Sequence, residues 1–435
     1  GKVNKFPQRV PWFDNQYLRD ITLDSSFKNL AVDERGDLMA WDMKSCETIL
    51  PDQNLIEVKI SNNVAYGLNK KGEILVIPVK DKELRERYTE RKRSLLTPWK
   101  KYCSYKWKLE TKQLFNEKGE KNVTQFSTGR EHLVFISNVG KAYTCATGIS
   151  PLEATKSRGQ FGIPTLSQFD PFPKCNQVYE IELLNNVLGS DKVSKRTIEQ
   201  VECGNYHTLA RDSVGELYSF GLNTYGQLGH PISYDMEYIP FPKKVSNFNA
   251  HFTRDNFLKC VDIHCSGDTS YASVIPQDVH KYFRDKNANI AEDMDNVTYF
   301  SFGNGLQGQL GNGHFKHSQP EPTKLKVLNE IKDYITKDKS KRVKIEQWGC
   351  GDKHVICKLE NNDVLVWGYN ENGQLGNGKR IKWCKPSNVP KLLEPGIKYN
   401  KNPEELLFTI NNRLQLKPEQ QLAAGGNASC IYWKR

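Results

Sequence analysis

The amino-acid sequence predicts an all-β fold, a seven-bladed β-propeller that carries helical insertions in its blade loops. One observation is a motif, Gly-x-x-His followed by an aromatic-Gly step, that runs from Gly204 to Gly221 and again from Gly351 to Gly368, 17 positions in both copies. A second is that weaker copies keep this register along the rest of the chain. Supersecondary units repeated at intervals are typical of rings and solenoids, in which each unit buries its faces against its neighbours.

Seven repeat units can be placed in chain order. The first two, 25–42 and 61–78, retain only the spacing, whereas the third is weaker in identity but keeps Gly129 and His132 in register. The fifth has Ser270 where the third, fourth and sixth have histidine, and the last begins at Gly426 but stops before its aromatic-Gly step. The seven units start at positions 25, 61, 129, 204, 267, 351 and 426.

Each unit predicts a short antiparallel sheet. In the fourth unit an alternating segment, 207–210, is followed by a turn at Gly215 and a second apolar strand over 216–220. A tight hairpin turn needs a positive φ, which favours glycine, and Asn362 takes that place in the sixth unit. Because a single hairpin is marginally stable in water, whereas a ring of small sheets buries both faces of each, a propeller is the predicted outcome.

The two ends of the chain are expected to meet. A ring of blades closes best when strands from both ends share one blade, and residues 10–15 read Val-Pro-Trp-Phe-Asp-Asn, a worn copy of Val-x-Trp-Gly-x-Asn. We therefore expect residues 1–24 to supply the missing strand beside 426–435, so that residues 1–435 form a single domain.

The composition indicates a folded globular protein but does not identify its partner. The 435 residues are 37% hydrophobic and 26% charged, as in a folded globular protein. The longest strongly apolar run, 74–79, is far shorter than the roughly 18 residues that a membrane-spanning helix needs. The net charge of +11 permits RNA, anionic lipid or an acidic protein as a partner. Eleven cysteines, an odd number without a Cys-x-x-Cys pair, indicate reduced thiols in an intracellular compartment.

Motifs that resemble catalytic or cofactor sites are explained better by the repeat. Residues 303–308 read Gly-x-Gly-x-x-Gly, but no helix is predicted after them, and 373–380 lack the hydroxyl residue that ends a phosphate-binding loop. His132, His207 and His354 come from different blades, so we expect each to satisfy nearby backbone groups rather than share a metal. No nucleophile or carboxylate pair stands in a catalytic setting. We expect no catalytic residue, no metal, no cofactor and no enzymatic chemistry.

The second unit carries a long insertion, 80–122, that is rich in basic and aromatic residues. Basic side chains attract phosphates and aromatic rings stack on bases, so single-stranded RNA is an allowed partner, as are lipid headgroups. The alternatives are a protein partner and a solvated helix over 81–96 that packs on the propeller through Leu84, Tyr88 and Leu95. The candidate partner-binding residues are Arg91, Lys92, Arg93, Trp99, Lys100, Lys101, Tyr105 and Trp107.

Two further insertions, 324–344 and 396–420, are expected to be helical. In the first, apolar residues from Leu325 to Ile335 recur at helical intervals. In the second, Asn-Pro-Glu-Glu at 402–405 has the pattern of an N-cap, a first-turn proline and an acidic first turn. We expect both helices to pack on the ring.

Short Gly-Gln-Leu-Gly segments follow the aromatic-Gly step at 226–229, 308–311 and 373–376, with a looser Gly-Gln-Phe-Gly at 159–162. Together with Gly-x-x-His and Trp-Gly-x-Asn, they resemble the repeat of the regulator of chromosome condensation family over nearly the whole chain. The resemblance implies a seven-bladed propeller in which the motif residues are structural. Those residues are Gly129, His132, Gly204, His207, Gly221, Gly303, Gly351, His354, Trp367, Gly368 and Gly426.

The worn repeats, the basic excess and the Asn/Lys-rich insertions resemble the mitochondrial branch of that family, particularly its fungal members. The branch implies a mitochondrial protein, on the matrix side of the inner membrane, that acts as a non-enzymatic assembly scaffold for a respiratory complex, complex III in fungi. The expected partner is a protein client, a complex subunit or another assembly factor. Membrane association is expected only through a segment outside these residues.

The resemblance leaves two other functions open. One is guanine-nucleotide exchange on a small or dynamin-like GTPase, which needs no acid or nucleophile of the protein's own. The other is mitochondrial ribosome biogenesis as an RNA-associated factor, with the basic insertion over 80–122 as the RNA-binding element.

Overall fold

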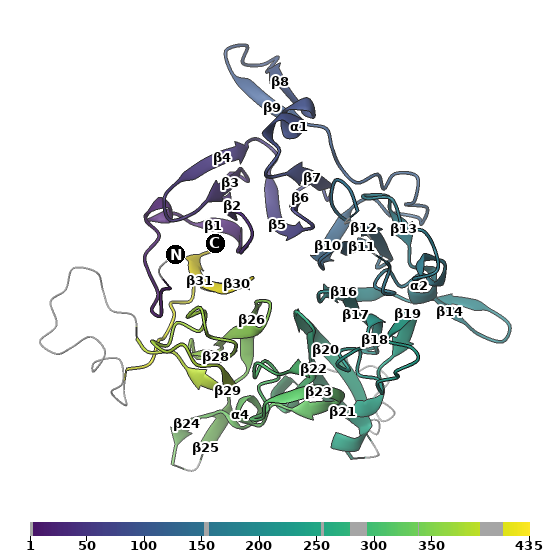
Figure 1. The fold of residues 1–435 in the computed structure, drawn as a ribbon, viewed down its shortest axis with the longest axis vertical. Coiled ribbons are helices and arrows are strands. Elements are labelled where there is room, and N and C mark those ends of the chain that lie inside the picture. The colour runs from purple at the N-terminus through teal and green to yellow at the C-terminus, as the bar shows by residue number, and fades with distance from the viewer. Residues whose placement is uncertain (1–2, 152–155, 254–255, 279–293, 338, 392–411) are drawn as a thin grey trace, which may run out of the picture.

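The structure is a computed structural model that describes residues 3–151, 156–253, 256–278, 294–337, 339–391 and 412–435. Small antiparallel sheets stand around a central axis, so the chain forms a ring (Figure 1). Within each sheet the strands follow one another in chain order, with the first strand nearest the axis. This is the topology of a β-propeller.

Six of the sheets have three or four strands. Blade 1 contains β1 (Leu18–Thr22), β2 (Asn29–Asp33), β3 (Leu38–Trp41) and β4 (Cys46–Leu50), and blade 2 contains β5 (Leu55–Ser61), β6 (Val64–Asn69) and β7 (Ile74–Pro78). Blade 3 contains β10 (Val123–Thr128), β11 (His132–Ser137), β12 (Ala142–Ala146) and β13 (Tyr179–Glu180), and blade 4 contains β16 (Ile198–Cys203), β17 (His207–Asp212), β18 (Leu217–Leu222) and β19 (Tyr238–Lys244). Blade 5 contains β20 (Asn256–Ser266), β21 (Thr269–Asp278), β22 (Thr298–Gly305) and β23 (Lys316–Lys324), and blade 6 contains β26 (Ile345–Cys350), β27 (His354–Leu359), β28 (Val364–Gly368) and β29 (Trp383–Asn388).

The seventh position in the ring holds a two-stranded sheet. It consists of β30 (Gln420–Gly425) and β31 (Ala428–Trp433) and lies between blade 6 and blade 1 (Figure 1). The predicted all-β propeller is therefore confirmed, with six blades of three or four strands and a smaller sheet in the place of the seventh.

Seven clusters of buried apolar side chains fill the spaces between neighbouring sheets, one at each interface in the described part of the chain. The cluster between blades 5 and 6, for example, contains Tyr271 and Trp367, which are fully buried. The core of the protein is thus a ring of interfaces, and burial of apolar surface at each one holds the sheets together.

The N-terminal segment lies at the seam but does not form the expected strand. Residues Pro11–Phe13 form a short 3-10 helix (η1), because Pro11 cannot donate to a strand ladder. Trp12 donates to the carbonyl of Asp42 at 2.7 Å and packs in one cluster with Cys430 of β31. Nearer the N-terminus, the amide of Gly378 donates to the carbonyl of Lys5 at 3.0 Å.

The helices in the described residues are short, and two helical predictions were wrong. In the insertion 80–122, α1 covers only Lys82–Arg87, and the chain then forms a hairpin of β8 (Thr89–Arg93) and β9 (Lys101–Tyr105). Leu95, expected to anchor a helix, is 99% exposed. The helix ends at Arg87, and residues 89–93 pair instead with 101–105 across a turn that contains Pro98.

The insertion 324–344 behaves in the same way. Its helix α4 covers only Lys326–Glu330 and is followed by a hairpin of β24 (Lys332–Thr336) and β25 (Lys339–Arg342). Leu325 and Leu328 are buried as predicted, whereas Ile335 lies on an exposed strand. The third predicted helix, in 396–420, falls mostly on residues 392–411, outside those that the structure describes.

The remaining elements lie in the loops between blades or between strands of one blade. Between blades 3 and 4 lie α2 (Glu182–Asn185) and a hairpin of β14 (Asn186–Leu188) and β15 (Val193–Lys195). Short 3-10 helices cover Pro164–Leu166 (η2), Asn247–His251 (η3) and Met294–Asn296 (η4). None of the helices in the described residues has the length and apolar character to span a membrane.

Candidate functional site

The histidines of the repeat form hydrogen bonds between blades. Each occupies the start of the second strand of its blade and is fully buried. Each Nε2 lies within hydrogen-bond distance of a hydroxyl oxygen in the next sheet. The three pairs are His132–Thr208 at 3.0 Å, His207–Ser270 at 2.8 Å and His354–Ser429 at 2.9 Å.

The partners of these hydroxyls fix the protonation state of the rings. Thr208 donates to the carbonyl of Gln160, and Ser270 donates to the carbonyl of Gln227, so the hydroxyl proton is already used and the imidazole Nε2 must be the donor. Burial lowers the pKa of His207 to about 3. A second proton on its Nδ1 would have no acceptor among the described residues. The rings are neutral and join the blades.

The repeat glycines allow this arrangement. A Cβ added to Gly129, Gly204 or Gly351 would lie 2.0 to 2.2 Å from the ring of the histidine three residues later. The glycines of the aromatic-Gly step have a positive φ, and at Gly368 (φ 107°) a Cβ would lie 2.5 Å from the carbonyl oxygen of Lys353. Only glycine permits both the backbone conformation and the close approach. The same conformation recurs at Gly221 and Gly303, and Gly426 has a φ of 51°.

A further repeated contact lies on the strands nearest the axis. In blades 1 to 6 the first strand has a β-bulge at the same place, and the residue after it is Asp, Glu or Gln. The three glutamines each donate to the backbone carbonyl and accept from the backbone amide of one residue in the next sheet. The pairs are Gln125–Val201, Gln200–Ile263 and Gln347–Leu422.

Sequence reasoning missed this contact. The signal is an apolar residue followed two positions later by Asp, Glu or Gln, as in Leu18-Arg19-Asp20 and Ile198-Glu199-Gln200. The side chain varies among three residue types, so the pattern is visible only once the bulges align the strands.

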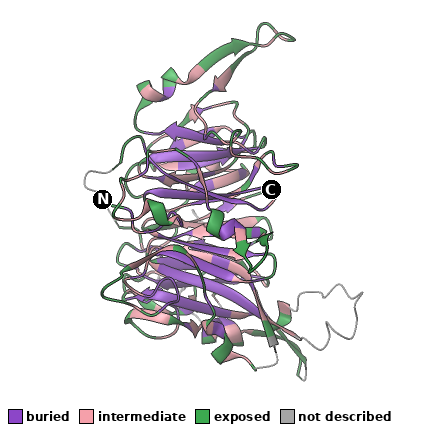
Figure 2. Ribbon diagram, turned by 90° about the vertical axis from the view of Figure 1, so that its right-hand side faces the viewer, coloured by how far each residue is buried: buried purple, intermediate pink, exposed green. Residues whose placement is uncertain are grey.

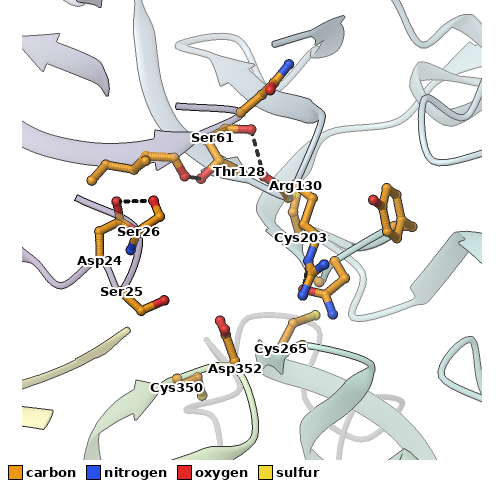
Figure 3. Close-up of a pocket in the computed structure, with 18 of the residues that line it drawn as sticks. Asp24, Ser25, Ser26, Ser61, Thr128, Arg130, Cys203, Cys265, Cys350 and Asp352 are labelled. Carbon is orange, nitrogen blue, oxygen red and sulfur yellow. Dashed lines mark hydrogen bonds between the residues drawn. The ribbon is translucent and has the colours of Figure 1, made fainter. Parts of the chain in front are cut away.

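The turns between first and second strands line a cavity at one end of the axis. The cavity has a volume of about 510 Å³ and takes residues from all six larger blades (Figure 3). Its lining is mainly polar and includes Asp24, Ser61, Arg130 and Asp352, each from a different blade. We call it the axial cavity.

A belt of hydrogen bonds between neighbouring turns makes the wall of the axial cavity rigid. The bonds join Ser61 Oγ to Gly129 O, Arg130 N to Asn205 O, Asn205 N to Gly267 O, Ser266 Oγ to Gly351 O and Asp352 N to Gly426 O. Burial raises the pKa of Asp352, against the attraction of Arg130 and Lys353. The cavity therefore presents charges of both signs on a fixed backbone.

Three thiols also line the axial cavity, those of Cys203, Cys265 and Cys350. Burial raises the pKa of all three, to about 12 for Cys203. They are neutral at physiological pH, and a neutral thiol is a poor nucleophile and a poor metal ligand. Across the described residues no group of three or more His, Cys, Asp or Glu is arranged to hold a metal ion.

The candidate partner-binding residues separate into two groups. Tyr105 is buried, its hydroxyl donates to the carbonyl of Val76 at 2.6 Å, and Trp107 packs against Tyr88 with ring centres 4.6 Å apart. These two aromatics fix the base of the β8–β9 hairpin on blade 2. The six remaining candidates lie on the projecting part and are exposed: Arg91, Lys92, Arg93, Trp99, Lys100 and Lys101.

Comparison with known proteins decides the family. Two family models of the regulator of chromosome condensation (RCC1) repeat match the chain. One matches residues 198–227 and 345–374, and the other matches 214–273, 298–357 and 361–399. Protein FMP25, mitochondrial, from Saccharomyces cerevisiae is 46% identical to this chain over 444 residues, covering 100% of this chain and 71% of the relative. The chain belongs to the RCC1-repeat family.

Other similarities are weaker. The Ultraviolet-B receptor UVR8 of Arabidopsis thaliana is 26% identical over 47% of this chain and 35% of its own length. Among solved structures, human WBSCR16 superposes with a TM-score of 0.61 at 15% identity, covering 100% of this chain and 90% of that one. Prp20p from Saccharomyces cerevisiae superposes with a TM-score of 0.59 at 16% identity, covering 97% and 84%. These two structures show the shared fold.

The similarity to FMP25 extends over the full length of this RCC1-repeat chain, including its worn first two units and its insertions. The predicted family and the predicted mitochondrial location are thereby confirmed.

Proposed function

We propose that the protein is a non-enzymatic scaffold in mitochondria that holds a protein client while a respiratory complex is assembled. The observation that carries this proposal is the rigid axial cavity. Turns from six blades converge there, and hydrogen bonds join the turns of blades 2 to 6 and the two-stranded sheet in succession, so the face offers fixed polar groups to a client without having to reorganise. Pre-organised surfaces bind partners at a lower entropic cost.

The repeat residues support a scaffold rather than a catalyst. His132, His207 and His354 are neutral and engaged in contacts between blades, and the cavity thiols are neutral as well. The histidines are thus committed to contacts between blades, and the thiols lack the charge that nucleophilic attack needs. The resemblance to the fungal mitochondrial branch favours complex III as the client's destination, on the matrix side of the inner membrane.

Two alternatives each have one observation in their favour. A nucleotide-exchange factor needs a polar face that docks a GTPase, and the axial cavity with Asp24, Arg130 and Asp352 is such a face. An RNA-associated factor needs exposed cations, and the β8–β9 hairpin offers Arg91 and Lys101 among others.

The test is site-specific photo-crosslinking in isolated mitochondria. A photoreactive amino acid replaces Ser26 or Asn62 at the axial cavity, and Lys243 on the outer strand β19 serves as the matched control. We expect cavity positions, but not Lys243, to crosslink respiratory-complex subunits or their chaperones. The scaffold proposal fails if both kinds of position capture the same proteins. Capture of a GTPase at the cavity, in an amount equal to that of this protein, supports nucleotide exchange instead. Capture of ribosomal proteins that disappear after nuclease treatment supports the RNA-associated function.

A further inference from the structure

The β8–β9 hairpin projects from the rim of the ring (Figures 1 and 2), and its tip carries apolar side chains. At the tip Leu95 is 99% exposed, Leu96 93% and Trp99 78%. The turn is ordered by its own hydrogen bonds: the amide of Lys100 donates to the carbonyl of Thr97 at 2.8 Å. The tip thus holds three large apolar side chains in water on a structured turn, an arrangement that burial against a partner would stabilise.

A collar of basic residues lies directly behind the tip. Residues 89–105 contain five basic side chains and one acidic one, Glu90. Glu90 is paired with Lys92 and Lys106 near the base of the hairpin. Within the described residues the other collar cations form no ion pair, and they are exposed: Arg91, Arg93, Lys100 and Lys101.

The base of the hairpin is fixed to the ring. The amide of Cys103 donates to Asp52 at 2.9 Å, Gln53 donates to the carbonyl of Cys103 at 2.9 Å, and Tyr105 donates to the carbonyl of Val76 at 2.6 Å. The hairpin is therefore held at a defined position on blades 1 and 2, and its tip extends away from both.

We propose that the tip of the β8–β9 hairpin docks the propeller onto an anionic lipid bilayer. The order along the hairpin matches the layers of a membrane surface: leucine and tryptophan first, then cations about 3 to 13 Å behind them at the rise of a strand, then polar residues. Tryptophan favours the membrane interface, leucine favours the acyl layer, and basic residues attract anionic headgroups. Apolar anchoring combined with a basic cluster gives stable membrane binding.

The chemistry favours a bilayer over RNA as the occupant. Single-stranded RNA is recognised by aromatic stacking along a basic groove, whereas two of the three tip side chains are leucines, which cannot stack on bases. The proposal goes beyond the scaffold function. It also places membrane association within these residues rather than only in a segment outside them.

The experiment measures co-sedimentation of the full chain with phosphatidylcholine vesicles, with or without about one-fifth cardiolipin. The tip variant is Leu95→Ser/Leu96→Ser/Trp99→Ser, and the collar variant changes Arg91, Arg93, Lys100 and Lys101 to Gln. Tyr334→Ser/Ile335→Ser is the matched control, since these side chains are 78% and 61% exposed on another basic hairpin that lacks an apolar tip. We expect binding only to anionic vesicles, at least about tenfold weaker binding by the tip and collar variants, and no change in the control.

A second measurement tests insertion of the tip. Lipids with bromine-labelled acyl chains should quench part of the tryptophan fluorescence, and Trp99→Phe should bind vesicles while losing that quenching. Equal melting temperatures of the parent and the variants ensure that losses are local. The proposal is overturned if the parent binds neutral vesicles equally well, if the tip variant binds as the parent does, or if Trp99 stays unquenched in bound protein. Binding of RNA or of a protein through the tip without vesicle binding overturns it as well.

Discussion

The Nε2 of His207 lies 2.8 Å from the Oγ of Ser270, and this contact joins two blades through residues from the same place in successive repeats. The hydroxyl of Ser270 in turn donates a hydrogen bond to the carbonyl of Gln227, so three repeat motifs share one chain of hydrogen bonds. Protonation would leave Nε2 as a donor but would place a buried charge on the ring and a proton on Nδ1, which has no acceptor among the described residues. This makes the contact sensitive to acid.

His207→Asn should destabilise the fold by about 1 to 3 kcal/mol near pH 7.5, because a buried hydrogen bond is lost and a cavity is left. The folded pKa of His207 is lowered to about 3 from 6.5, so the parent's stabilisation is complete above pH 6.5 and falls as the pH drops toward 3. The difference between parent and variant should therefore shrink below pH 6.5, by up to about 1.4 kcal/mol per pH unit. Urea unfolding at three pH values measures it, and a difference independent of pH contradicts the assignment.

Gly368→Ala should destabilise the protein far more than Gly119→Ala. Both positions have a positive φ, but a Cβ at Gly368 meets the carbonyl of Lys353 at 2.5 Å, whereas at Gly119 nothing lies within 4 Å. The control isolates the conformational cost of about 1 kcal/mol, and the additional steric cost at Gly368 should exceed about 2 kcal/mol. Thermal unfolding compares the two variants. Similar losses for both would mean that the close contact relaxes freely.

Asp20→Asn should stabilise the protein above neutral pH. Burial, followed by the nearby Glu57, raises the pKa of Asp20 to about 7, so the folded state favours the protonated acid and loses stability as the pH rises from about 4 to about 7. Asparagine keeps an oxygen to accept from the amide of Val58 and carries no charge. We expect a gain of about 1 to 2 kcal/mol near pH 8, since Asp20 is partly exposed, and none near pH 4. An equal gain at both pH values would point to packing instead of ionisation.

Gln347→Glu should loosen the two-stranded sheet at neutral pH. Gln347 donates to the carbonyl of Leu422 and accepts from its amide, both at 2.8 Å, and a carboxylate loses the donor and faces that carbonyl with negative charge. Hydrogen exchange over 420–433 should accelerate at pH 7 and slow again near pH 4, where a protonated carboxyl can donate as the amide does. Gln125→Glu, which changes the contact between blades 3 and 4, is the matched control and should leave 420–433 unaffected.

The repeat was predictable because glycine has few substitutes where φ is positive. Gly215 marks the hairpin turn and Gly368 the aromatic-Gly step, and Asn362, which also has a positive φ, takes the place of the turn glycine in the sixth unit. The axial glutamines were not predictable from spacing alone, since Asp20 and Glu57 occupy the same bulge position as Gln125. The contact depends on the side chain that follows the β-bulge and faces the next blade, and the spacing of the repeat does not identify that side chain.

The helical insertions were overpredicted for a physical reason. The apolar residues near Leu325 have helical spacing, but one short turn of helix is enough to bury Leu325 and Leu328, and α4 is that turn. Beyond that turn no apolar face remains to be buried, so the exposed residues pair as a hairpin. The apolar hairpin tip at Leu95 was likewise expected to be an anchor, because sequence periodicity does not tell a face buried in the protein from one that meets a partner.

The contacts at the seam determine the order in which this protein can fold. The hydroxyl of Tyr17 donates to Glu419 at 3.1 Å, and the two residues are 402 positions apart. During synthesis from the N-terminus, almost the entire chain must be made before the two-stranded sheet can cover the face of blade 1 at the seam. The apolar side chains of Leu18 and Leu23, which end in one cluster with Tyr432, stay open to solvent until then. Closure of the ring is thus the late, slow step, and it is the stage at which a chaperone would be needed most.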